Sequence, residues 1–135
     1  MTELDFTGPR PPLHGEEAVY FEFCRRGELR IQRCGSCGRH VFYPRAICPH
    51  CLAAELEWVP ASGRGAVHTF TVQHRAGPDY RGPMPFVIAI VELEEGVRML
   101  TRIAADPETV RIGMPVTVAW ATLAEDFQVP VFEPA

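Results

Sequence analysis

Two Cys-x-x-Cys pairs constrain this chain more than any other feature of its sequence. Cys34 and Cys37 form the first pair, and Cys48 and Cys51 form the second, within the stretch CGSCGRHVFYPRAICPHC. Each Cys-x-x-Cys turn can direct two sulfur atoms at one ion, and two such turns complete the tetrahedral shell that zinc prefers. The spacing therefore predicts a structural zinc ribbon, with iron as the alternative metal for four thiolates.

The same spacing disfavours other uses of the cysteines. Two facing pairs would chelate a metal before either pair acted as a dithiol redox site. Four thiolates also close the coordination shell, whereas a catalytic zinc keeps one position open. The fifth cysteine, Cys24, is expected to be a small buried hydrophobe on a helix. We therefore expect the metal to stabilise the ribbon, because about thirty residues bury little core on their own.

The charges of the chain are unevenly distributed. The net charge is −4, and the basic residues are all arginine. Several arginines precede or lie within the ribbon, and we expect contact with a ligand or partner from Arg25, Arg26, Arg39 and Arg45. A guanidinium suits both phosphate and carboxylate, so the cluster indicates a docking surface, with a solvated charged face as the alternative. The negative net charge disfavours general nucleic-acid binding.

The pattern of apolar and turn-forming residues divides the chain into four segments. We expect a flexible N-terminal arm over residues 1–15, a helix with a lead-in strand over 16–31, the zinc ribbon over 32–60 and a barrel over 61–135. The helix is indicated by apolar residues at i and i+4, namely Val19 with Phe23 and Tyr20 with Cys24. Gly27 is expected to end it.

From residue 63 onward the sequence is patterned for strands. Residues 63–75 alternate, which predicts one face formed by Ala66, His68, Phe70, Val72 and His74. Further strands are expected at 85–93, 97–103, 115–122 and 127–133, with a small helix over 106–113 between the second and third of these. Three strands, a short helix and two strands is the order of an OB barrel, and a small β-sandwich is the alternative.

Individual residues refine this expectation. Asp106 is expected to cap the small helix and Gly113 to end it. Pro130 is expected to restrict the last strand to an edge or a bulge. His74 and Arg75 precede a loop over residues 76–85 that is rich in proline and glycine, so we expect them at the mouth of a ligand site.

Several classes of protein find little support in the sequence. It contains no nucleophile-elbow motif and no glycine-rich phosphate loop, which disfavours a stand-alone enzyme. No apolar run approaches the ~20 residues of a membrane span, and no signal peptide is visible. Cysteines in tight pairs suit metal binding in a reducing compartment, so the expected location is cytoplasmic.

The joined motifs resemble the DUF35 family over residues 16–133. The resemblance runs through GELRIQRC, the ribbon sequence, LEWVPASGRGAVHTFTV, PFVIAIVELEEGVRML and DPETVRIGMPV, in that order. It implies a mainly β protein with an N-terminal helix, a rubredoxin-like zinc ribbon and a five-stranded OB-fold barrel. The metal positions of the family match Cys34, Cys37, Cys48 and Cys51.

What the resemblance implies about function is a partner role. Members of the family are typically small subunits or domains beside thiolase-like enzymes, and others are fused or paired with hydratases, so the catalytic residues lie in the partner. The chain is therefore expected to be a non-catalytic accessory subunit that docks onto a thiolase-superfamily enzyme and helps shape its acyl-CoA channel. The alternatives are a zinc-ribbon and OB-fold nucleic-acid-binding protein and a stand-alone acyl-CoA hydrolase or hydratase.

Overall fold

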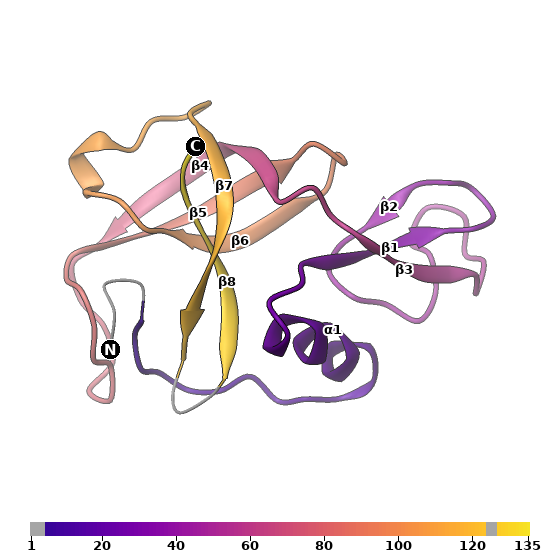
Figure 1. Ribbon diagram of the computed structural model, residues 1–135, viewed down its shortest axis with the longest axis horizontal. Helices are drawn as coiled ribbons and strands as arrows, with labels where there is room; N and C mark the ends of the chain where they lie inside the picture. The colour runs from indigo at the N-terminus through magenta and orange to yellow at the C-terminus, as the bar shows by residue number, and fades with distance from the viewer. Residues whose placement is uncertain (1–4, 124–126) are drawn as a thin grey trace.

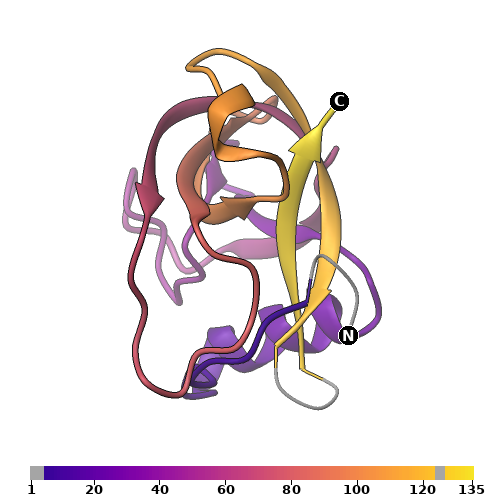
Figure 2. The same cartoon turned by 90° about the vertical axis from the view of Figure 1, so that its left-hand side faces the viewer.

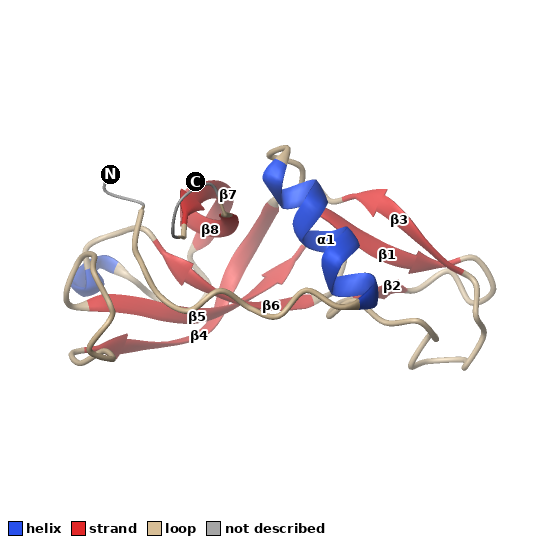
Figure 3. Cartoon of the chain, turned by 90° about the horizontal axis from the view of Figure 1, so that it is seen from below, coloured by secondary structure: helices blue, strands red, loops and turns tan. Residues whose placement is uncertain are grey.

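A zinc-ribbon-like sheet and a five-stranded barrel, with one helix packed at their junction, make up the computed structural model, which describes residues 5–123 and 127–135. Figure 1 shows the barrel on the left, the small sheet on the right and α1 (Gly15–Arg25) below their junction. Viewed from below, the molecule is elongated and α1 crosses it where the two parts meet (Figure 3). Within the described residues, no helix has the length and apolar character that a membrane span requires.

The N-terminal helix ends where the sequence predicts, but the set of side chains that it buries differs from the predicted one. Gly27 follows it with φ of 74° and donates its N–H to the carbonyl of Cys24 at 2.9 Å, which confirms the predicted helix end. Tyr20 and Cys24 are buried, but Val19 is exposed. The buried face of α1 therefore leaves out Val19 and includes Phe21, which packs on Phe127 and against the core.

The small sheet has the order β2-β1-β3 and is antiparallel throughout. Its strands are β1 (Arg30–Cys34), β2 (His40–Val41) and β3 (Leu56–Pro60). The buried Gln32 ties it to the loop that follows β2, since its side-chain amide donates to the carbonyl of Arg45 and accepts from the N–H of Arg45, each at 2.8 Å. These bonds satisfy a buried polar side chain that would otherwise destabilise the fold.

The second part is a closed barrel with the strand order β4-β5-β6-β8-β7, which is the OB arrangement predicted from the sequence. The strands are β4 (Arg64–Gln73), β5 (Phe86–Leu93), β6 (Arg98–Ile103), β7 (Pro115–Thr122) and β8 (Gln128–Pro134). Val87, Val91 and Met99 lie in its core with Phe132, which is fully buried. The same core continues into the ribbon through Ile31, so the two parts share one apolar interior.

The predicted alternation along β4 is wrong after Val67. The pairing with β5 shifts register between Val67 and Thr69, which marks a β-bulge at His68. Val67 is buried and Phe70 and Val72 pack on the same core, whereas His68 is exposed. A bulge adds one residue to a strand, so side chains beyond it point to the opposite face from the one that alternation predicts. A regular alternation of apolar and polar residues does not indicate where a bulge lies.

The elements near the C-terminus also differ in detail from the prediction. Asp106 caps a single turn, η1 (Pro107–Thr109), by accepting the N–H of Glu108 at 3.0 Å. The turn ends at Thr109 and not at Gly113, which instead lies in a tight connection with φ of 87°. Pro130 pairs with Trp120 of β7, whereas the bridge between β8 and β6 joins Phe132 to Ile103 two residues further on and closes the barrel. The position is therefore compatible with the predicted one-sided pairing of a proline.

The N-terminal segment crosses the barrel before it reaches α1. Phe6 donates its N–H to the carbonyl of Thr122 at 3.2 Å, and Thr7 donates to that of Arg81 at 2.7 Å. Figure 2 shows this segment running beside the long loop between β4 and β5. The segment thereby connects that loop to the end of β7.

Candidate metal centre and surface sites

The two Cys-x-x-Cys turns adopt the same backbone structure. In the first, Gly38 donates its N–H to the carbonyl of Cys34 at 2.8 Å, and its φ is 79°. In the second, Leu52 donates to the carbonyl of Cys48 at 2.9 Å, and its φ is 66°. Both turns thus need a left-handed residue directly after their second cysteine, a position where glycine is favoured and leucine is strained.

The matched turns bring the four sulfur atoms together. All four Sγ atoms lie within 4.8 Å of one another, with Cys34 and Cys51 at 3.6 Å and Cys37 and Cys48 at 3.7 Å. A tetrahedral ion with Zn–S bonds of about 2.3 Å places its sulfur ligands roughly 3.8 Å apart. The donor set and its spacing therefore fit a four-coordinate metal ion.

The surroundings of the sulfur atoms shift the pKa values of Cys48 and Cys51 in opposite directions. Burial raises the pKa of the Cys48 thiol, but backbone N–H groups of Cys51 and His50 outweigh it and lower that pKa to about 7. The Ala53 N–H lowers the pKa of Cys51, but burial and the neighbouring thiols raise it to about 11. Four thiolates this close repel one another, so a cation is required to hold them all ionised, and its binding releases protons.

The strained turn at Leu52 gives a testable expectation. Leu52 is 77% exposed, so replacing it removes little packing. The left-handed backbone costs a non-glycine residue about 1–2 kcal/mol, partly offset by the greater chain entropy that glycine loses on folding. Leu52→Gly should therefore raise the free energy of unfolding by about 0.5–1 kcal/mol, measured by denaturant titration of the metal-bound chain. Gly38→Ala, at the matched position, should lower it; equal effects of both changes would contradict this account.

Cys24 is separate from the metal centre. It is fully buried on the inner face of α1, and burial raises the pKa of its thiol to about 12. Its side chain therefore stays neutral in the folded chain at pH values where an exposed thiol ionises.

The burial of Cys24 makes the free energy of unfolding decrease at alkaline pH. Because the folded pKa lies above the unfolded value of about 8.5, the contribution is fully present below pH ~8.5 and is lost as the pH rises toward 12. The free energy of unfolding should fall by about 2 kcal/mol between pH 7 and 10, and by less in Cys24→Ala. Denaturant titrations of both proteins at the two pH values measure the difference. Rapid reaction of Cys24 with a thiol reagent in the folded chain at pH 8 would contradict its burial.

Two of the predicted arginines contribute to a groove between the ribbon and the barrel. The groove is about 360 Å³ in volume, and Arg45, His40 and His50 line its ribbon side. On the barrel side lie Glu92 and Arg98, which form an ion pair at 3.1 Å. Arg39 reaches this region by donating from Nη1 to Nδ1 of His50 at 3.3 Å. The groove thus has an excess of basic groups.

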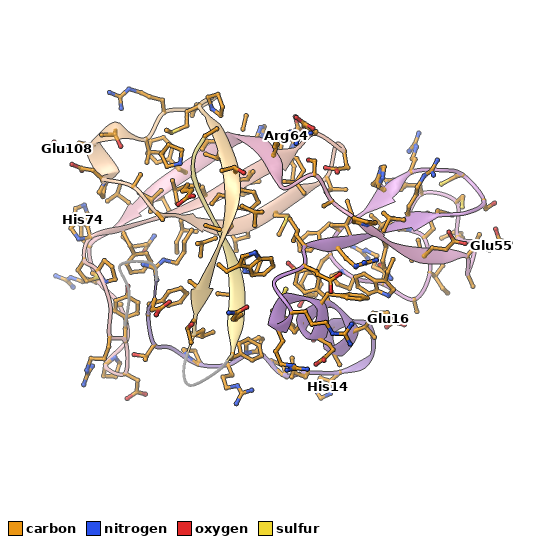
Figure 4. The ribbon with its side chains drawn as sticks, viewed as in Figure 1. His14, Glu16, Glu55, Arg64, His74 and Glu108 are labelled. Carbon is orange, nitrogen blue, oxygen red and sulfur yellow. The ribbon has the colours of Figure 1, made fainter. Side chains whose placement is uncertain are left out.

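The other predicted residues lie elsewhere. Arg25 and Arg26 end α1, and both form ion pairs with Glu22, at 2.7 and 3.7 Å. His74 and Arg75 are exposed beyond the end of β4. Figure 4 shows His74 and Glu108 at the end of the barrel remote from the ribbon, and both line a shallow pocket there. The predicted residues therefore form three separate surfaces.

No sequence motif indicates the position of Arg102. Arg102, on the outer face of β6, is half-buried among the rings of Phe6, Tyr80 and Phe86 and lines a cavity. These rings come from the N-terminal segment, from the long loop and from the start of β5, and Phe6 is far from the other two in the sequence. Only the tertiary fold brings them together.

Comparisons with known proteins agree with this architecture. Residues 21–57 match the family model described as ChsH2, rubredoxin-like zinc ribbon domain, and residues 58–121 match ChsH2, C-terminal OB-fold domain. A chain of the solved structure described as Ltp2-ChsH2(DUF35) aldolase is 36% identical, with a TM-score of 0.84, and the match covers 93% of this chain and 98% of that one.

Three curated relatives carry different names. A DUF35 domain-containing scaffold protein of Methanocaldococcus jannaschii is 44% identical over 70% of this chain and 68% of its own length. The benzoylsuccinyl-CoA thiolase subunit BbsA of Thauera aromatica is 26% identical over 73% and 67%. A probable enoyl-CoA hydratase alpha subunit of Thermomonospora curvata is 38% identical over 94% of this chain, which spans only 40% of that relative's length.

Proposed function

The chain belongs to the DUF35 family, and on that premise we propose that it is a non-catalytic accessory subunit that docks onto a thiolase-superfamily enzyme acting on acyl-CoA. The observation that carries the proposal is the set of four sulfur atoms within 4.8 Å of one another. Four thiolates complete a tetrahedral shell and leave no position at which a substrate could bind the metal. The metal then stabilises the ribbon, and the chemistry belongs to the partner.

The metal we propose is zinc. Four cysteines on two matched turns are typical of structural zinc sites, and the same ligands also accept iron. Elemental analysis of the purified chain distinguishes zinc from iron. The colour of the protein is a second criterion, since zinc gives a colourless protein and iron in four thiolates gives a coloured one. We also place the protein in the cytoplasm, where thiols stay reduced and available to a metal.

The names of the relatives support a thiolase-like partner. One is a subunit of a CoA-ester thiolase, and a similar solved chain is part of an aldolase described with two named components. We propose that acyl-CoA lies at or near the shared interface. The basic groove formed by Arg39, Arg45, His40 and His50 is the candidate surface for its phosphates or for an acidic patch of the partner.

A pull-down of the tagged chain from its native host tests the partner. We expect a thiolase-like enzyme to be recovered in a defined ratio, and Arg39→Glu combined with Arg45→Glu to weaken its recovery. Arg111→Glu is the control, because Arg111 is exposed, donates to the carbonyls of Glu108 and Val110, and does not line the groove. Recovery of no thiolase-like protein would contradict the proposal.

A hydratase is the second candidate partner. It is favoured by the Thermomonospora curvata relative, whose name is that of a hydratase alpha subunit and of which this chain spans 40%. In that case the chain corresponds to the ribbon and barrel portion of such a subunit, and the same pull-down should recover a hydratase component. The identity of the recovered enzyme distinguishes the two candidates.

A further inference from the structure

The guanidinium of Arg102 is held in a cage of three aromatic rings. Its Cζ lies 4.0 Å from the ring centroid of Phe6, 4.1 Å from that of Phe86 and 5.6 Å from that of Tyr80. A cation against ring faces is attracted by their quadrupoles, and the attraction is larger where water is excluded. The cage therefore fixes the plane of a half-buried positive charge.

The cage requires a close approach of two chain segments. A Cβ on Gly82 would lie 2.7 Å from the Tyr80 hydroxyl and 2.8 Å from Cβ of Phe6. Its φ of 155° is also a conformation that other residues rarely adopt. Glycine at this position thus lets the long loop close on the N-terminal segment and on Tyr80, with Arg102 enclosed.

The caged charge has no carboxylate partner within residues 5–123 and 127–135. The ion pairs in these residues involve other arginines. The side chain of Arg102 makes one hydrogen bond there, from Nη2 to the Tyr80 hydroxyl at 3.0 Å. A guanidinium has five N–H donors arranged along its edge. Because rings pack against its faces, the edge is the part available to a ligand oxygen.

Arg102 lines a cavity next to the cage. Its volume is about 340 Å³, and most of its lining is apolar, from Pro83, Pro85, Ile103, Ala104, Ala105 and Val131. Cavities of this size with few polar groups are typical of small-molecule sites. Asp106 also contributes to the lining and would repel a doubly charged anion.

We propose that this cavity binds a small organic carboxylate with an aromatic or short aliphatic body. The carboxylate accepts two N–H bonds from the edge of Arg102, and the apolar body rests against the proline and alanine side chains. A single guanidinium with Asp106 nearby favours a monoanion over phosphate. The site is formed by the barrel and by the N-terminal segment that crosses it, and it does not depend on the partner proposed above.

The test is a titration of the full metal-bound chain with benzoate and hexanoate. Binding is followed by NMR through the backbone amides of residues 103–106, which line the cavity. Benzamide, which has the same shape without the charge, and inorganic phosphate are the comparison ligands. We expect saturable shifts with both carboxylates below about 10 mM, and at least about tenfold weaker binding of benzamide and phosphate.

Two variants locate the charge that is responsible. Arg102→Lys should weaken benzoate binding about tenfold or more, because lysine lacks the planar fork. Arg64→Lys, at an exposed arginine outside the cavity, should leave the affinity unchanged. The comparison of benzoate with benzamide needs no variant, so the test holds even if Arg102→Lys fails to fold. Absence of saturable shifts, equal binding of benzamide, tighter binding of phosphate, or shifts confined to the ribbon would each overturn the proposal.

Discussion

Cys34→Ser should abolish metal binding and unfold the ribbon. The Cys34 sulfur is buried and lies 3.6 Å from that of Cys51, so its loss opens the shell of four sulfurs. Structural zinc sites contribute on the order of 10–16 kcal/mol of apparent binding free energy at neutral pH. The metal content per chain should fall from about one to near zero, as measured by elemental analysis after gel filtration.

The loss should reach beyond the ribbon. Ile31 on β1 shares one core with Val67 and Val87 of the barrel, so unfolding of the ribbon exposes apolar surface of the barrel as well. We therefore expect partner binding to be lost together with the metal. Cys24→Ala is the matched control, because Cys24 lies outside the sulfur cluster and its change should leave the metal in place. A Cys34→Ser chain without metal that still folds and binds its partner would refute the structural role.

Phe132→Ala should destabilise the barrel by about 3–5 kcal/mol. Phe132 is fully buried and lies where β8 meets both β7 and β6. Its removal leaves a cavity at the point that closes the barrel, and the neighbouring strands β6 and β7 limit the collapse of that cavity. Because single domains are stable by only about 5–15 kcal/mol, this change should remove a large share of the free energy of unfolding.

Denaturant titration of the Phe132→Ala chain in its metal-bound form measures this effect. Leu100→Ala on neighbouring β6 is the control, since Leu100 is 73% exposed and its truncation should change the free energy of unfolding by less than about 0.5 kcal/mol. If the two changes had similar effects, the barrel core would not be organised as described. Retention of metal by Phe132→Ala would show in addition that the ribbon survives damage to the barrel.

The parts of the fold that repeat a local pattern could be predicted from the sequence. The two cysteine pairs predict the ribbon because ligand spacing and turn geometry are local properties. The barrel order follows from strand patterns with turn residues between them, and the cap at Asp106 is a local hydrogen bond. The left-handed turn at Leu52 could be inferred only by analogy with Gly38, since leucine does not itself indicate such a backbone.

Features that depend on tertiary contacts could not be predicted. The bulge at His68 interrupts a regular alternation, and the barrel closes through a bridge between β6 and β8, which are not consecutive strands along the chain. The cage of Arg102 joins residues 6, 80, 86 and 102, and no window of sequence contains them all. The same holds for the groove at Arg45, whose walls come from the ribbon and from the hairpin between β5 and β6.

Reconstitution with the partner tests the central claim most directly. The thiolase-like enzyme of the same host is assayed for acyl-CoA turnover alone, with the wild-type chain and with Cys34→Ser, and the wild-type chain is also assayed alone. We predict no turnover by the chain alone, a gain in activity or stability of the enzyme with the wild-type chain, and no gain with Cys34→Ser. Turnover by the purified chain alone, or full activity of an enzyme that does not bind the chain, would contradict the account.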